Sequence, residues 1–430
     1  MSPAWVLPEA ADARPLRIHD DQARLDEVLA RARKAPFYAD RLADARASSW
    51  TRVPFTTKDD LRRSYPFAML ATSRSELASY HESTGTSGEP TASYFTERDW
   101  DDVAQRFARN AIDLRSSDTV LVKTPYAMVT TAHQMHRAAR LRGALVVPAD
   151  NRSSNMSYAR VLRLLADLPV TVTWCLPTEA VLWAAAARAL GRDPSRDYPS
   201  FRALLVAGEP TSTEKRRRIG ELWSARVFED FGSTETGSLG GECPAGSLHL
   251  WSDRLLFEVL DPATGAVSEE GHGELVVTTL EREAMPLVRY RLGDVVEVSN
   301  AGCACGWRLP TVRVSGRSGT AIRVAGRGVR AIDVEAAVFS LPLERGVLFW
   351  RARAGGDDIE VEIEVAEAQA AVARDEVEAA VFARTGVRAS VRAVSEGTLV
   401  KTSALTTKVS FRKPKFLFDA QDDWSSAITY

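Results

Sequence analysis

The sequence predicts an α/β protein. A large N-terminal domain combines a parallel α/β sheet with an antiparallel sheet or barrel, and a small, mobile α+β domain follows it. Three observations lead to this prediction. Apolar runs alternate with helical patterns over residues 118–211, turn-punctuated alternating runs follow residue 232, and a glycine-rich break at 316–319 precedes a new strand, turn and helix pattern. The first pattern indicates a parallel sheet covered on both faces, and the second indicates antiparallel strands.

The elements follow in order along the chain. The first hundred residues are predicted to form a helical cover, because residues 20–33 have apolar side chains at helical spacing and residues 56–61 look like a capped helix start. The predicted parallel strands lie in TVLVKTP, ALVVPAD, VTVTWCLP and FRALLVAGEP. Antiparallel strands are predicted in LLFEVLDPATGAVSEEGHGELVVTTL, where Asp261-Pro262 and Thr264-Gly265 are turn signals. AIDVEAAVFSLP is a predicted helix of the C-terminal domain.

Length and charge limit the possible classes. A chain of 430 residues exceeds what one hydrophobic core usually supports, so we expect two domains, residues 1–316 and 317–430. The 55 Lys and Arg residues nearly balance 57 Asp and Glu residues, which gives no electrostatic reason to expect nucleic acid or a membrane as partner. No apolar run reaches the roughly 20 residues that span a bilayer, and the start lacks a signal-peptide pattern. We therefore expect a cytoplasmic protein.

A loop rich in hydroxyl side chains is the strongest local signal. It lies within HESTGTSGEPT at residues 81–91, where glycines allow tight bends and backbone N–H and O–H groups can bind a polyphosphate. It is not a Walker A loop, because Glu89 follows the last glycine. An ordinary Ser/Thr/Gly turn is the alternative. The candidate phosphate ligands are Ser83, Thr84, Gly85, Thr86, Ser87 and Gly88.

A second motif, DFGSTET at residues 230–236, follows the strand-like run ARVFE. Its aromatic ring can stack on a purine, and Glu235 can hold a Mg²⁺ ion bound to phosphates. Taken alone, the ring could equally be part of the core and the acid could be solvated. The nucleotide-binding candidates here are Asp230, Phe231, Gly232, Ser233 and Thr234, with Glu235 as the magnesium ligand.

Two turns complete a possible nucleotide site. In YRLGD at residues 290–294, Asp294 follows a glycine and can accept hydrogen bonds from both ribose hydroxyls, although a turn-capping role is the simpler explanation in isolation. Gly208, Glu209 and Pro210 end an apolar strand. Ligands of open α/β sheets bind beyond the carboxyl ends of the strands, so this turn can face adenine.

The order of these motifs, followed by Gly316-Arg317-Ser318, resembles the adenylate-forming superfamily, and specifically its phenylacetate-coenzyme A ligase branch. The resemblance covers nearly the whole chain. Supporting stretches are APFY at residues 35–38, VPFTTKDDL at 53–61, YPF at 65–67 and AMPLVRYR at 284–291.

The resemblance implies a division of roles. It makes residues 1–316 an adenylation domain that binds ATP and the acid, and residues 317–430 a lid. Ser83 to Gly88 would contact the phosphates, Gly208 to Pro210 and Phe231 the adenine, Glu235 the Mg²⁺ ion and Asp294 the ribose, with Arg317 near the hinge. The acid pocket would lie partly on the turn of residues 126–131. The candidate substrate ligands there are Tyr126, Ala127, Met128 and Thr131, although Tyr126 and Met128 could equally be core residues.

A possible zinc site lies between these motifs. Cys243, His249, Cys303 and Cys305 match a closed tetrahedral Zn²⁺ set, and some members of this branch carry such a site. The spacing departs from the usual two-residue knuckles, so unligated thiols are the alternative. Cys175 lies in an apolar strand and is predicted to serve packing.

Two positions depart from the family pattern. Gly319 and Thr320 follow the hinge motif where acidic residues are usual, and Leu405 stands where the catalytic lysine aligns most simply. Lys401 or Lys408 would supply that cation from a shifted loop. Alternatively, both lysines are solvated ends of a basic segment.

The function predicted is ATP-dependent adenylation of a small aromatic carboxylic acid, followed by transfer to coenzyme A, in secondary metabolism. One alternative passes the acyl group to an amine, a hydroxyl or a carrier-protein thiol. A second is a non-catalytic nucleotide or acyl-adenylate binder. ATP, Mg²⁺, coenzyme A and structural Zn²⁺ are the expected cofactors, and a homodimer is left open.

Overall fold

The computed structural model describes residues 6–83, 89–153, 155–406, 415–422 and 424. The chain forms two compact units. The first comprises Met1–Asp118, Pro125–Val146 and Phe228–Ser318, and the second comprises Thr119–Thr124, Val147–Val227 and Gly319–Tyr430.

Two helices of the first unit confirm predictions made by position. They are α1 (Gln22–Ala32), within the predicted 20–33, and α3 (Lys58–Arg63), at the predicted helix start. This unit also contains α2 (Pro36–Ala39), α4 (Glu97–Ala108) and α5 (Thr131–Leu141). The N-cap of α3 is Thr57, whose hydroxyl accepts a bond from the Asp60 N–H while the Asp60 carboxylate accepts one from the Thr57 N–H. This reciprocal capping box satisfies two backbone donors at the helix start.

The sheet of the first unit is antiparallel, as predicted. Its strands lie in the order β11-β10-β12-β13-β14-β9-β8-β7. Their bounds are β7 (Arg226–Ser233), β8 (Gly237–Glu242), β9 (Leu248–Leu250), β10 (Leu255–Leu260), β11 (Val267–Ser268), β12 (Gly271–Thr279), β13 (Tyr290–Ser299) and β14 (Thr311–Arg317). The turn after β10 contains Asp261 and Gly265, where the turn signals place it. Buried Trp50, Trp251, Leu275 and Leu287 belong to the core cluster of this unit.

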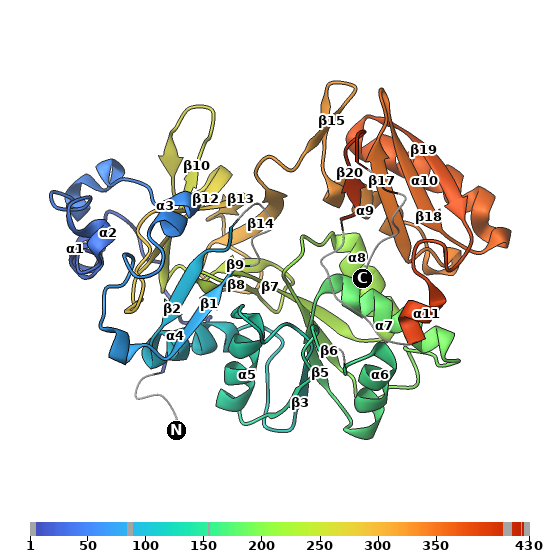
Figure 1. Cartoon of the computed structure of the whole chain (residues 1–430), viewed down its shortest axis with the longest axis horizontal. Coiled ribbons are helices and arrows are strands. Elements are labelled where there is room, and N and C mark those ends of the chain that lie inside the picture. Colours follow the sequence, from blue (N-terminus) through green and yellow to red (C-terminus); the bar gives the residue numbers. More distant parts are fainter. Residues whose placement is uncertain (1–5, 84–88, 154, 407–414, 423, 425–430) are drawn as a thin grey trace. The chain divides into compact units, whose positions relative to one another are not determined.

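A hairpin in the first unit was missed by the sequence reading. Strands β1 (Ser79–Glu82) and β2 (Ala92–Phe95) pair antiparallel, with Glu82 opposite Ala92, in a region predicted to be helical (Figure 1). Neither SYHE nor ASYF belongs to a continuous apolar run like those that indicate the equally short β3, β5 and β6. Strand β7 also runs further than predicted, to Ser233 within the DFGSTET motif.

The second unit contains the predicted parallel strands β3 (Thr119–Val122), β5 (Val172–Cys175) and β6 (Ala203–Val206). Strands β5 and β6 are buried along their whole length, which explains their continuous apolar sequences. Strand β4 is Leu145–Pro148, and the helices between strands are α6 (Tyr158–Asp167), α7 (Pro177–Ala189) and α8 (Thr213–Trp223). Every residue from Pro177 to Ala187 of the predicted Ala-rich helix is buried.

The remaining residues of this unit have the predicted α+β character. A hairpin of β15 (Ile322–Val324) and β16 (Arg327–Val329) precedes α9 (Ala331–Phe339). A four-stranded sheet has the order β19-β18-β17-β20, from β17 (Phe349–Ala354), β18 (Asp358–Glu364), β19 (Arg388–Val394) and β20 (Leu417–Phe418). Helix α10 (Ala370–Thr385) packs against it, and α11 (Thr402–Thr406) follows β19 (Figure 1).

Residues 319–430 group in one unit with residues 147–227. The predicted division of the chain after residue 316 therefore stays a prediction. None of the helices in the described part of the chain combines the length and apolar character needed to cross a bilayer.

Candidate functional site

The ends of the hydroxyl-rich loop are held together by the β1/β2 hairpin. Ser83 donates its N–H to the Thr91 carbonyl at 3.0 Å, and the Ser83 hydroxyl accepts the Thr91 N–H at 3.0 Å. The Thr91 hydroxyl also donates to Glu235 Oε1 at 2.6 Å. The hairpin therefore connects the start of the predicted phosphate loop to the predicted magnesium ligand. The other loop candidates, Thr84, Gly85, Thr86, Ser87 and Gly88, lie outside the described residues.

Glu235 lies in a nearly closed environment, with 4 % of its surface exposed. The Lys58 ammonium is 3.8 Å from its carboxylate. Lys58 and Thr91 are not among the site residues predicted from the sequence. A basic residue at the first position of α3 opposes the helix dipole, which favours acids there, and this unfavourable placement was a usable signal for Lys58.

Asp294 interacts electrostatically with Glu235. Its Oδ1 atom is 3.2 Å from Arg317 Nε, and Arg317 Nη1 donates to the Leu292 carbonyl at 2.9 Å. Gly293 has φ +81°, a left-handed conformation in which glycine is least strained. Burial raises the pKa of Asp294 to about 6; the Arg317 charge opposes this rise and the Glu235 charge adds to it. The structure thus brings Glu235, Asp294 and Arg317 within electrostatic reach of one another.

The other residues of the DFGSTET motif differ in burial and in hydrogen bonding. Asp230 is buried, accepts a 2.7 Å bond from the Ser238 hydroxyl, and has a pKa raised well above its usual range by burial. This hydrogen bond joins β7 to β8, and the role of Asp230 as a nucleotide contact stays a prediction. Phe231 is half-buried against the core cluster of the first unit. A Cβ atom on Gly232 would come within 2.4 Å of the Gly237 carbonyl oxygen, so this turn needs glycine. Ser233 and Thr234 are half-buried, and the Ser233 hydroxyl lies 3.0 Å from that of Thr236.

The Gly208-Glu209-Pro210 turn belongs to the second unit. Gly208 has φ +83°, and Pro210 is exposed. Glu209 Oε2 accepts bonds from the Thr178 hydroxyl at 2.7 Å and the Thr178 N–H at 3.2 Å. The carboxylate therefore satisfies a free backbone donor at the start of α7.

The lysine loop also belongs to the second unit. Lys401 is exposed just before α11, and Lys408 lies outside the described residues. Leu405 is 6 % exposed and packs in the same core cluster as α7. The apolar residue at the expected lysine position therefore serves packing.

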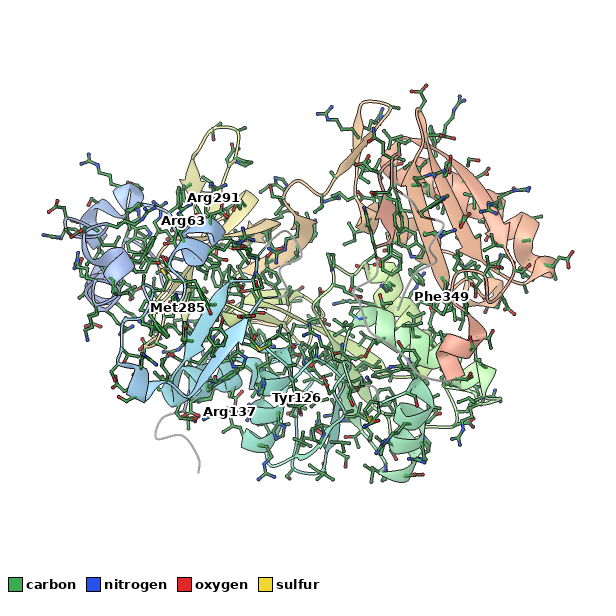
Figure 2. All side chains as sticks on the ribbon, in the orientation of Figure 1. Arg63, Tyr126, Arg137, Met285, Arg291 and Phe349 are labelled. Atoms are coloured by element: carbon green, nitrogen blue, oxygen red, sulfur yellow. The ribbon has the colours of Figure 1, made fainter. Side chains whose placement is uncertain are left out.

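The turn predicted to bind the acid is held by two histidines of α5. His136 Nδ1 lies 3.0 Å from the Tyr126 hydroxyl, and His133 Nε2 lies 2.9 Å from the Tyr126 carbonyl. Tyr126 is labelled in Figure 2. Met128 has φ +67° and is 43 % exposed, so it is not a core residue.

The neighbours of this turn are also fixed. The Met128 carbonyl accepts a 2.6 Å bond from the Glu82 N–H. Ala127 is exposed, and the Thr131 hydroxyl donates to the Pro125 carbonyl at 3.4 Å. His81 packs edge-on against His133, and burial lowers the pKa of His81 to about 4. The sequence reading missed the contribution of these histidines, because only the fold brings β1 next to α5.

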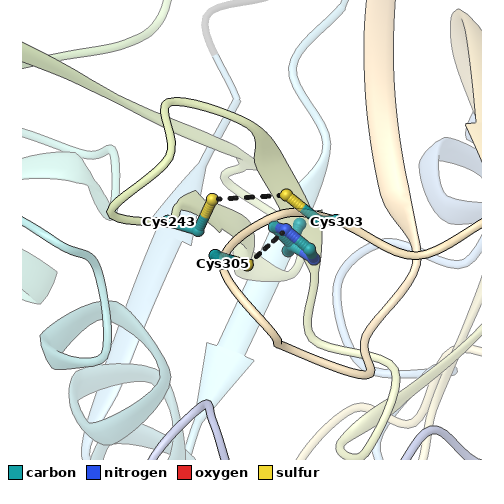
Figure 3. A group of neighbouring side chains, drawn as sticks. Cys243, Cys303 and Cys305 are labelled. Atoms are coloured by element: carbon teal, nitrogen blue, oxygen red, sulfur yellow. Dashed lines mark hydrogen bonds between the residues drawn. The ribbon is translucent and has the colours of Figure 1, made fainter.

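The predicted zinc ligands converge. The ligand atoms of Cys243, His249, Cys303 and Cys305 all lie within 4.8 Å of one another (Figure 3). Cys243 Sγ is 3.9 Å from Cys303 Sγ, and Cys305 Sγ is 3.5 Å from His249 Nε2. A tetrahedral zinc ion with ordinary bond lengths separates two sulfurs by about 3.8 Å, and a sulfur and a nitrogen by about 3.6 Å. The set can therefore hold a tetrahedral metal ion.

The surroundings also orient these ligands. His249 Nδ1 lies 2.7 Å from the Leu309 carbonyl oxygen, so it carries the proton and leaves the Nε2 lone pair facing the cysteines. The Trp307 N–H donates to Cys305 Sγ at 3.3 Å. Cys175 is buried in β5 and belongs to a core cluster of the second unit, which agrees with the predicted packing role.

Comparison with known proteins places the chain in a family. Residues 19–280 match the AMP-binding enzyme family. The chain is 32 % identical over 327 residues to phenylacetate-coenzyme A ligase of Thermus thermophilus, a match that covers 74 % of this chain and 72 % of that one. This chain is an adenylate-forming enzyme of the phenylacetate-coenzyme A ligase branch. The corresponding ligase of Pseudomonas putida is 29 % identical over 322 residues, which cover 71 % of each chain.

Solved structures of adenylate-forming enzymes share the fold. A 2-hydroxyisobutyryl-CoA ligase in complex with 2-HIB-AMP superposes with a TM-score of 0.84 at 23 % identity and covers 97 % of this chain and 94 % of that chain. An anthranilate CoA ligase in complex with anthranoyl-AMP gives a TM-score of 0.56 at 18 % identity, over 79 % and 67 % of the two chains. The predicted fold class is confirmed.

Proposed function

We propose that this enzyme activates a small aromatic carboxylic acid with ATP and transfers the acyl group to coenzyme A. The observation that carries the proposal is the convergence of Ser83, Glu235 and Asp294 in a chain that is similar over most of its length to phenylacetate-coenzyme A ligases. Hydroxyl and carboxylate groups in this arrangement suit the phosphates and the ribose of one nucleotide.

The reaction follows from the poor reactivity of carboxylates. A carboxylate oxygen of the acid attacks the α-phosphorus of ATP, pyrophosphate leaves with the electron pair of the broken P–O bond, and an acyl-adenylate forms. The thiolate of coenzyme A then attacks the acyl carbon and AMP leaves. Charge grows on the phosphate oxygens in the first step, so donors fixed in advance accelerate it.

The residues of the first unit would bind the nucleotide and its Mg²⁺ ion in this reaction. Glu235 and the hydroxyls of Ser83 and Thr91 offer oxygen atoms of the kind that Mg²⁺ prefers, and the ion would neutralise phosphate charge when bound. The Lys58 ammonium, 3.8 Å from Glu235, adds positive charge at the same place. Asp294 would accept bonds from the ribose hydroxyls, and Arg317 would hold its carboxylate in position.

Gly208, Glu209, Pro210 and Phe231 remain the proposed adenine contacts, and Tyr126, Ala127, Met128 and Thr131 the proposed acid contacts. An exposed methionine in a turn fixed by α5 suits a flat aryl ring.

A pyrophosphate-release assay tests the proposal. Purified enzyme with ATP and Mg²⁺ is given benzoate, anthranilate, salicylate, phenylacetate or a series of aliphatic acids. We expect release with at least one aromatic acid and formation of its coenzyme A thioester. Release with aliphatic acids alone would contradict the aromatic specificity, and silence with every acid would contradict the ligase assignment.

A second candidate changes only the acceptor. The altered lysine loop, in which Leu405 is buried at the expected lysine position, permits an enzyme that passes the acyl group to an amine, a hydroxyl or a carrier-protein thiol. Product masses measured with and without coenzyme A separate the two candidates. Tight AMP binding without pyrophosphate exchange would instead indicate the non-catalytic binder. Lys401 and Lys408 remain proposed sources of the missing cation.

We also propose that Cys243, His249, Cys303 and Cys305 bind a structural Zn²⁺ ion. Support comes from the match of the interatomic separations to tetrahedral zinc geometry and from the oriented His249 ring. The ion would connect the β8–β9 segment to the loop before β14. The cytoplasmic location, the role in secondary metabolism and a homodimeric state stay predictions.

A further inference from the structure

A chain of buried polar groups in the second unit ends at the proposed adenine turn. Glu209 Oε2 accepts the Thr178 hydroxyl at 2.7 Å, and Lys215 Nζ donates to the same Thr178 oxygen at 3.1 Å. Lys215 Nζ also lies 2.9 Å from Glu335 Oε2. Thr178, Lys215 and Glu335 are all at most 4 % exposed. The three hydrogen bonds therefore connect Glu335 of α9 to Glu209 without contact with solvent.

Further contacts hold Lys215 and Glu335 in place. The Ser212 hydroxyl caps α8 by accepting the Lys215 N–H at 3.1 Å, which sets the start of the helix that carries Lys215. Glu335 Oε1 accepts the Ser212 N–H at 2.8 Å, so both oxygens of this buried carboxylate are bonded. The Phe416 ring lies 5.3 Å from the ammonium of Lys215 and adds a cation–π contact.

Glu209, at one end of this series of hydrogen bonds, has a second carboxylate oxygen that can accept a hydrogen bond. Glu209 Oε1 is buried, and no group in the described part of the chain hydrogen-bonds to it. A buried acceptor without a partner is unfavourable, so a ligand that donates a hydrogen bond to this oxygen would gain affinity. The exocyclic amine of adenine is a donor of the required kind.

We infer that Lys215 and Thr178 are positioning residues that hold the Glu209 carboxylate in the orientation needed to meet adenine. This inference deepens the proposed function and rests on it. Lys215 fixes the Thr178 hydroxyl as a donor to Glu209, because that oxygen accepts the ammonium proton on its other side. Glu335 in turn holds Lys215. The proposed adenine turn is thereby coupled to a carboxylate of the region 319–430.

The simpler possibility is that Glu209 only caps α7. In that case, loss of the hydrogen bonds between Glu209, Thr178 and Lys215 would lower the stability of the protein and leave nucleotide affinity unchanged. Variants of Thr178 separate the two, because they cut the link to Glu209 and leave the Lys215–Glu335 pair intact.

The experiment measures AMP binding by calorimetry and the KM values for ATP and acid, together with thermal unfolding midpoints. Thr178→Val removes the hydroxyl and keeps the side-chain shape. We expect AMP binding at least about tenfold weaker and a similar rise in the KM for ATP, with the KM for the acid changed by less than about twofold. Thr178→Ser, which keeps the hydroxyl, should restore the affinity.

The matched control is Thr173→Val. The Thr173 hydroxyl is equally buried in the same unit and donates to the Leu121 carbonyl at 2.9 Å, so its removal tests a general loss of stability. Unchanged AMP affinity in Thr178→Val, or equal losses in Thr178→Val and Thr173→Val, would overturn the inference.

If Thr178→Val does not fold, Glu209→Gln replaces it, because the amide keeps one oxygen for Thr178. We expect weaker AMP binding in this variant, and wild-type affinity would overturn the inference. Failure of the unaltered protein to bind AMP would instead refute the proposed function itself, and the inference would fall with it.

Discussion

The Asp294→Asn variant is expected to bind AMP more weakly and to lose a pH dependence that the unaltered protein shows. Burial raises the pKa of Asp294 to about 6, against the opposing charge of Arg317 3.2 Å away. With that value, about 97 % of the carboxyl groups are ionised at pH 7.5 and about 9 % at pH 5. If the ionised form accepts hydrogen bonds from the ribose hydroxyls, AMP affinity is about tenfold lower at pH 5 than at pH 7.5.

The ionisation of Asp294 that favours AMP binding is expected to lower the stability of the folded protein. The folded pKa of Asp294 lies above its unfolded value of 3.8, so its contribution to stability is fully present below about pH 3.8 and is lost as the pH rises through about 6. The ionised carboxyl therefore disfavours the folded state at pH 7.5 by up to roughly 3 kcal/mol. Asn removes this penalty, so the variant should unfold at a higher temperature at pH 7.5.

The assay is AMP titration by calorimetry at several values of pH between 5 and 7.5, with thermal unfolding at each. Titration of the AMP phosphate contributes equally to both proteins, so the difference between them reports Asp294. An Asp294→Asn variant that binds AMP with wild-type affinity and the wild-type pH profile would refute the assignment of Asp294 to the ribose.

Three further predictions concern catalysis, metal and core. Glu235→Gln should reduce the rate of pyrophosphate release about a hundredfold or more at saturating Mg²⁺, because the charge proposed to bind the metal is lost; wild-type kcat would contradict the proposed role. Purified protein should contain one zinc per chain by elemental analysis, Cys243→Ser should lose it, and Cys175→Ala should keep it; zinc-free wild-type protein would contradict the site. Leu205→Ala in β6 should destabilise the protein by about 2–5 kcal/mol in denaturant unfolding, whereas Leu190→Ala, 44 % exposed, should change little; equal effects would contradict the assigned burial.

Much of the fold follows from local sequence patterns. The parallel strands of the second unit, the Ala-rich α7, the capped α3 and the turn at Asp261 were all predicted, because apolar periodicity and turn chemistry are properties of neighbouring residues. The β1/β2 hairpin was missed because its strand sequences, SYHE and ASYF, lack the continuous apolar runs that indicate the equally short parallel strands. Four candidate metal ligands, three cysteines and a histidine, were predicted from their residue types and the family resemblance, and the fold brings their side chains together.

The site depended on tertiary structure to a larger degree. Motif chemistry singled out Glu235 and Asp294, but not Lys58, whose ammonium reaches Glu235 from another element. Asp230 belongs to the same motif as Glu235, yet its side chain turns inward to Ser238. Alternation along a strand places neighbouring residues on opposite faces, and only the packing of the sheet decides which face is buried.

The sequence by itself determined most of the elements, with the β1/β2 hairpin as an exception, together with the residue types of the nucleotide motifs and the family, because each of these is encoded in short stretches of the chain. Tertiary structure alone decided which distant side chains meet. The chain from Glu209 through Thr178 and Lys215 to Glu335 joins four segments, and none of them indicates its partners in the sequence. The physical reason is that hydrogen bonds and electrostatic shifts depend on distance and burial in space, which arise only when helices and strands pack.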